Sequence, residues 1–170
     1  DRQSECQNHE LFENKRAEFI SPEEVPEGVP SWVLPLHIVY EPNKPTKPRC
    51  CHDGASKLNG ISLNDQILTG SDLLNSLLGI IFRFRENKVT LSADIKGFFH
   101  QVYVDERDTY VFQFWWFDDE DCTNPRLCLL RVHIFGAKSS PTVCTFVLRH
   151  HGKQMEKELS PEAALAIIKS

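Results

Sequence analysis

The 170-residue sequence lacks any apolar run near the roughly 18 to 20 residues that a membrane-spanning helix needs. Its first ten residues are polar, so they do not form a secretory signal peptide. It also has no internal repeat and no low-complexity tract. Because 41% of the residues are hydrophobic and 10% are aromatic, a packed core is still within reach. We therefore expect a soluble, intracellular domain with no membrane partner.

A basic excess is missing as well. The net charge is −5, and residues 1–30 carry eight acidic residues against three basic ones. The remainder, 31–170, is therefore balanced, with 16 residues of each sign. Overall charge gives no support for nucleic-acid binding, which would need a local groove.

The six cysteines lack the spacing of a zinc site. Cys6 and His9 form one pair, and Cys50, Cys51 and His52 are adjacent, but neither group has a second pair at finger-like spacing. A disulfide framework would need an extracellular setting that nothing else in the sequence indicates. We predict reduced thiols.

Apolar periodicity and the positions of proline and glycine predict a mixed α+β domain. The expected helices are 10–20, 72–85, 141–159 and 160–170, with a turn or short helix at 98–104. The expected strands are 32–40, 49–52, 89–95, 109–117 and 127–134. The clearest helix is 72–85, whose leucines form one stripe and which Ser71 or Asp72 can cap. Residues 34–52 should form a hairpin with a basic tip, preceded by an extended linker at 21–30.

Three segments have residues suited to chemistry, although each alone is more often structural. Asp94 ends an apolar strand, where a carboxylate can hold a divalent cation or simply cap the next turn. Residues 133–142 form a Gly/Ser/Lys turn that leads into a helix, where free N–H groups can face a ligand or merely mark the turn. Lys44, Lys47 and Arg49 lie on the hairpin, where such a cluster is more often a solvated basic loop than a binding site.

Taken together and in this order, the segments resemble the fingers and palm of a reverse transcriptase of the type encoded by BEL/Pao long-terminal-repeat retrotransposons. The resemblance is carried by VPEGVPSWVLPLHIVYEPNKPTKPRCCHDGASKLNGISLND, LSADIKGFFHQVYV and FGAKSSPTVC. It implies an α+β fold with an antiparallel sheet and packed helices. It also divides the chain into an acidic leader with a helix and a Pro-rich linker (1–30), a fingers-like region (31–88) and a partial palm (89–170).

The resemblance also implies roles for individual residues. Asp94 corresponds to the metal-binding, catalytic aspartate of the first palm motif. Phe99 corresponds to the aromatic residue that blocks a ribose 2′-hydroxyl. Arg49 corresponds to the fingers arginine on the incoming triphosphate, with Lys47 or Lys44 as its lysine partner. Phe135 and Gly136 belong to the motif that supports the nucleotide and the template strand.

One family motif is not found in this sequence. The family's aromatic-x-Asp-Asp hairpin, which supplies two more carboxylates for two-metal phosphoryl transfer, should follow Pro141, and the chain ends first. The segment 116–119 has a similar composition but precedes Gly136, so we interpret it as a polar hairpin tip. The intact family enzyme uses Mg²⁺ and a primed template. We expect no tight Mg²⁺ binding and no polymerisation by this chain alone, and template binding only if the missing palm is supplied.

Two other interpretations stay open. The chain can be a catalytically dead, retrotransposon-derived module kept for dimerisation or for binding a protein partner. In that case the edge of strand 89–95, left open without the missing hairpin, would be the interface. An unrelated α+β domain with coincidental motifs is the remaining alternative.

Overall fold

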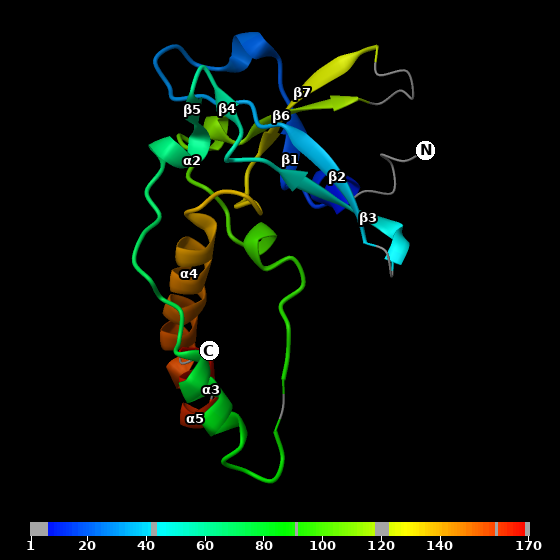
Figure 1. The fold of residues 1–170 in the computed structure, drawn as a ribbon. Helices are drawn as coiled ribbons and strands as arrows, with labels where there is room; N and C mark the ends of the chain where they lie inside the picture. Colours follow the sequence, from blue (N-terminus) through cyan, green and yellow to red (C-terminus); the bar gives the residue numbers. More distant parts are fainter. Residues whose placement is uncertain (1–6, 42–43, 91, 118–122, 159, 169–170) are drawn as a thin grey trace.

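Strand β7 (Pro125–Leu130) is the centre of a three-stranded antiparallel sheet, with β1 (Ala17–Phe19) on one side and β6 (Gln113–Phe117) on the other (Figure 1). This computed structural model describes residues 7–41, 44–90, 92–117, 123–158 and 160–168. In register, Cys128 lies opposite both Phe19 and Phe114. Four consecutive residues of β7, 127–130, are buried, as expected for a strand covered on both faces.

The hydrophobic core lies around this sheet. Helix α1 (Gln7–Glu13) contributes Leu11, which is almost fully buried. The other core residues are Ala17, Leu34, Leu63, Phe112, Phe114, Trp116, Cys128, Leu130, Val132, Ile134 and Ala137. They come from segments between positions 11 and 137, so α1 and β1 belong to the same packed unit as β6 and β7.

Two hairpins extend from this unit. Strands β2 (Leu36–Glu41) and β3 (Lys44–His52) pair antiparallel, which confirms the predicted hairpin, although its tip at 42–43 lies outside the described residues. Strands β4 (Lys57–Leu58) and β5 (Ile61–Ser62) form a smaller one that leads into helix α2 (Leu63–Gln66). Ser62 and Asp65 form a capping box at the start of α2.

The longer helices lie apart from the sheets (Figure 1). Helix α4 (Ser140–Gln154) continues through the 3₁₀ turn η4 (Met155–Lys157) and contacts helix α5 (Pro161–Ile168). Helix α3 (Leu77–Phe84) lies in the same lobe and carries large exposed apolar side chains. No helix in the described ranges is long and apolar enough to span a membrane.

Three sequence predictions need correction at the level of elements. The helix predicted at 10–20 ends at Glu13, because Lys15 has a left-handed φ of 56° and residues 17–19 pair with β7 instead. The helix predicted at 72–85 begins only at Leu77, since the Asp72 side chain accepts a hydrogen bond from the Leu74 N–H in a non-helical turn. Its leucine stripe is exposed, not buried.

The third correction concerns the strand predicted at 89–95. Residues 92–95 form no strand, and Val89 and Ile95 are exposed; Leu91 lies outside the described residues. The open strand edge that was expected to bind a partner is therefore not formed. Elsewhere the shifts are smaller: the predicted strand at 109–117 starts with the 3₁₀ turn η3 (Thr109–Val111). The turn at 98–104 is the 3₁₀ helix η2 (Phe98–Gln101), and η1 (Pro22–Glu24) lies in the linker.

Candidate functional site

A groove of about 680 Å³ separates the N-terminal helix from the segment that contains Asp94. Helix α1 and the turn after it form one wall, and strand β3 and residues 94–101 contribute the rest. The lining residues are Glu10, Leu11, Asn14, Arg16, Cys50, Cys51, Asp94, Lys96, Gly97, His100, Gln101 and Phe135. The groove therefore joins residues that lie up to 125 positions apart in the sequence.

Two of the predicted site residues, Asp94 and Phe135, line this groove directly. A third, Phe99, lies on η2, and its ring centroid is 4.6 Å from that of Phe135. Phe98 is a second aromatic neighbour of Phe99, with ring centroids 5.8 Å apart. The first and third sequence motifs thus come together, although Asp94 is on an exposed segment and not at the end of a buried strand.

The turn at Gly136 is locked against the base of the hairpin. Gly136 has a φ of 108°, and a Cβ atom there would clash with the backbone oxygen of His52. The Asn64 side chain spans the turn: its Nδ2 donates to the Gly136 oxygen at 2.9 Å, and its Oδ1 accepts from the Lys138 N–H at 2.9 Å. This packing fixes Phe135 beside the groove and explains why glycine is required at position 136.

For the basic residues of the hairpin, the structure describes the backbone only. Lys44 lies opposite Glu41, and Arg49 lies opposite Val39 in the β2–β3 ladder. The side chains of Lys44, Lys47 and Arg49 lie outside the described part of the structure. The two residues that follow Arg49 in β3, Cys50 and Cys51, line the groove.

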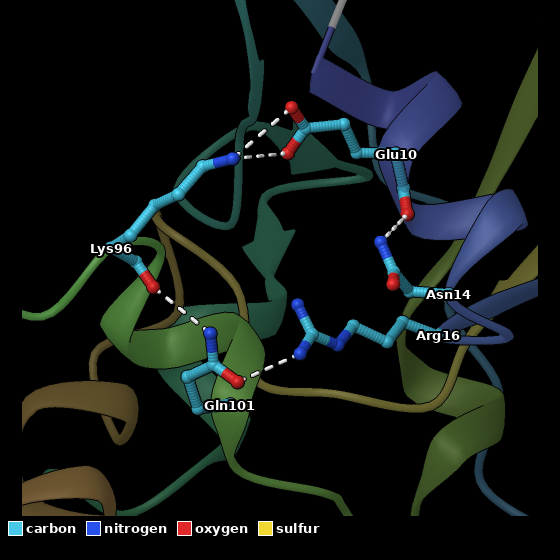
Figure 2. Close-up of polar contacts among 5 residues, drawn as sticks. All are labelled: Glu10, Asn14, Arg16, Lys96 and Gln101. Atoms are coloured by element: carbon cyan, nitrogen blue, oxygen red, sulfur yellow. Dashed lines mark hydrogen bonds and ion pairs between the residues drawn. The ribbon is translucent and has the colours of Figure 1, made fainter.

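A circuit of polar contacts links α1 to the Asp94 segment (Figure 2). The Lys96 Nζ lies 3.2 Å from a Glu10 carboxylate oxygen, and Arg16 donates to the Gln101 side chain at 2.7 Å. Gln101 in turn donates to the backbone oxygen of Lys96 at 2.9 Å, and Asn14 donates to that of Glu10 at 2.6 Å. Sequence reasoning missed these groove residues, because contacts between residues 85 or more positions apart leave no periodic signal.

Burial and positive charge keep the nearby histidines neutral. Burial, with a smaller effect from His100, lowers the pKa of His52 to about 3. Burial and the Arg16 guanidinium also lower the pKa of His100. His52 packs edge-on against Phe114, and no described residue hydrogen-bonds its Nε2. At neutral pH the cations of the groove are therefore lysine and arginine, not histidine.

The groove does not supply the carboxylates of a two-metal site. Among the lining residues that the structure describes, the acidic ones are Asp94 and Glu10, and Glu10 is paired with Lys96. Across the described residues, no three His, Cys, Asp or Glu side chains come together in a way that could hold a metal ion. The described residues therefore do not fit the pair of Mg²⁺ ions that the resemblance implies.

The thiol prediction holds only in part. Cys51, Cys128 and Cys144 are not disulfide-bonded, and burial raises the pKa of Cys144 to about 11, so that thiol is unreactive. Cys50, however, is disulfide-bonded. The prediction that every thiol is reduced is therefore wrong for Cys50. Its neighbour Cys51 lines the groove as a free thiol.

Neither the models of known protein families nor the curated proteins give a match to this chain. Its function has to be argued from the motifs and from the groove itself.

Proposed function

We propose that the chain is the fingers and part of the palm of a reverse-transcriptase-type polymerase, and that its groove receives an incoming deoxynucleotide. The observation that carries the proposal is the meeting of two motifs. Asp94 and Phe135 are 41 positions apart in the sequence, yet they line one groove, and Phe99 packs against Phe135. An unrelated domain with coincidental motifs has no reason to bring these residues together.

Each residue has a physical task in this proposal. The Phe99 ring, held by Phe98 and Phe135, would lie beneath the sugar and leave no room for a 2′-hydroxyl. Arg49 and Lys47 would neutralise the triphosphate from strand β3. The Gly136 turn would support the base from Phe135. Asp94 would be a metal ligand, but it cannot hold two ions alone, so we expect no primer extension by the 170-residue chain.

Nucleotide selectivity tests the proposal. We expect fluorescently labelled dATP to bind more tightly than labelled ATP by about 10- to 100-fold, the discrimination that a tight apolar contact gives. Phe99→Ala should bring the two affinities close together, and Phe99→Tyr should keep the preference. Phe146→Ala is the matched control, because it removes a ring of the same size from an exposed site outside the groove. Equal affinities for the two nucleotides in the unmodified chain would refute the proposal.

A second candidate function, a dimerisation module, is favoured by a specific observation on α3. Leu77, Leu78, Phe82 and Phe84 are each more than half exposed. Apolar surface gathered on one helix is typical of an interaction site. We propose a second copy of the chain as the occupant, with α3 in place of the strand edge expected from the sequence.

Light scattering after size exclusion measures the mass of the protein in solution and so tests this second candidate. A sharp dimer that Phe82→Glu converts to a monomer would support it, and Phe19→Glu in β1 is the control on another exposed aromatic. A monomer at all concentrations would rule it out and leave the nucleotide-binding proposal untouched.

A further inference from the structure

The Asp94 groove contains two permanent cations and a carboxylate from helix α1. Lys96 and Arg16 line the groove together with Glu10. His100 also lines it, but burial and the Arg16 guanidinium lower the pKa of its ring, which is therefore neutral at neutral pH. Among the lining residues that the structure describes, Lys96 and Arg16 are thus the positive partners that an entering anion meets.

The Lys96 ammonium is already occupied by Glu10. The Lys96 Nζ lies 3.2 Å from one oxygen of the Glu10 carboxylate and 3.3 Å from the other. Figure 2 shows the two side chains extended toward each other, Glu10 from α1 and Lys96 from the segment that leads into η2. The carboxylate therefore takes the place at Lys96 that a phosphate of a bound ligand would take.

This contact can open by the movement of side chains alone. The Glu10 and Lys96 side chains are 57% and 85% exposed, and ion pairs at such exposed positions are weak. The helix itself is fixed, because Leu11 is 2% exposed in the core and the Arg16 backbone oxygen accepts a hydrogen bond from the Arg131 N–H at 2.8 Å. Rotation of the Glu10 side chain therefore releases Lys96 while α1 stays in place.

We propose that Glu10 is an electrostatic latch, which holds Lys96 in the free protein and is displaced by a polyphosphate ligand. A carboxylate carries one negative charge, whereas a triphosphate carries several and can contact Lys96 and Arg16 at the same time. The inference rests on the proposed function for the kind of ligand, and it adds the regulation of that site. It also gives α1 a role, which none of the three sequence motifs does. A purely structural clasp would give the removal of Glu10 no reason to improve binding.

Isothermal titration calorimetry of the 170-residue chain with inorganic triphosphate tests the latch. At a salt concentration of about 0.15 M, interactions between exposed charges more than about 8 Å apart are largely screened, so a change in net charge alone has little effect. Glu10→Gln should raise the affinity about two- to fivefold, because Lys96 is then available in every molecule. Glu13→Gln removes the same charge from α1 outside the groove and should leave the affinity unchanged.

A double-mutant cycle shows whether Glu10 acts through Lys96. Lys96→Gln should lower the affinity for triphosphate severalfold, and Glu10→Gln in that background should bring no gain. Lys88→Gln makes the same charge change outside the groove and should have no effect. Circular dichroism confirms that each variant is folded.

Three results would overturn the latch. One is the absence of triphosphate binding in both the unmodified chain and Glu10→Gln, another is an equal gain from Glu10→Gln and Glu13→Gln, and the third is a gain from Glu10→Gln that persists in Lys96→Gln. The latch and the deoxynucleotide site fail separately. Equal affinities for labelled dATP and ATP would refute the deoxynucleotide site and do not bear on inorganic triphosphate, which has no sugar. A clear preference for dATP with no gain from Glu10→Gln would refute the latch alone.

Discussion

The strands of the sheet and helix α3 are both rich in apolar residues, but only the sheet buries most of them. Phe114 in β6 and Leu130 in β7 are completely buried, whereas Leu77 and Phe82 in α3 are 70% and 67% exposed. The difference shows that an apolar pattern predicts a surface that favours burial. It does not predict that another segment of the chain buries it.

The sheet obtains its cover from distant parts of the chain. Leu11 from α1 and Leu34 from the segment before β2 pack in the cluster around Phe114. In the α3 lobe, the segment before α3 is joined to α4 by hydrogen bonds such as Asn75–Arg149. These bonds hold the segment in place but leave the apolar faces of α3 uncovered.

The largest expected effect is a loss of stability that separates the two regions. Phe114→Ala should lower the free energy of unfolding by about 3–5 kcal/mol, because it leaves a cavity in a closed core. Phe82→Ala, which removes the same atoms from an exposed helix position, should change it by less than about 0.5 kcal/mol. Urea denaturation followed by circular dichroism measures both.

Similar losses of stability in the two variants would contradict this difference between the sheet and α3. That result would mean that α3 is covered in solution, since only a buried Phe82 has contacts to lose. Repeating the Phe82→Ala measurement at several protein concentrations then distinguishes a second copy from a cover within the chain, because only the former makes the midpoint concentration-dependent.

Sequence analysis predicts local elements well where local signals decide them. The β2–β3 hairpin and the α4 helix follow the predicted pattern. It fails where pairing with a distant strand competes with a local preference. Residues 17–19 have helical spacing but pair with β7, and residues 92–95 have strand composition but find no strand to pair with.

The candidate site also has one part that the sequence predicts and another part that it does not. Phe99 packs on Phe135, so the structure brings two of the predicted site residues together. The wall formed by Glu10 and Arg16 could not be predicted, because their partners, Lys96 and Gln101, are brought near only by the packing of α1 on the sheet. Exposed ion pairs of this kind are weak and carry no sequence signature of their own.

The two regions should also differ in how their histidines make stability depend on pH. His52 is 4% exposed in the sheet unit, and burial lowers its pKa to about 3, whereas His150 on α4 is exposed. Because the unfolded chain binds a proton at His52 near pH 6.5 and the folded chain does not, stability is complete above pH 6.5 and falls as the pH drops toward 3. From pH 7 to pH 5 the loss from His52 should be about 2 kcal/mol.

Denaturation midpoints at pH 7, 6 and 5 measure this effect. His52→Leu should flatten the pH dependence, and His150→Leu should leave it as it is. Some dependence should remain in His52→Leu, because burial also lowers the pKa of His133 and of His100. The pKa values of Asp65 and Asp105 are lowered by hydrogen bonds, and these carboxylates lose their contribution only at more acid pH, below this range. An unchanged slope in His52→Leu would mean that water reaches His52 in the folded chain, and that the junction between the hairpin and the Gly136 turn is open in solution.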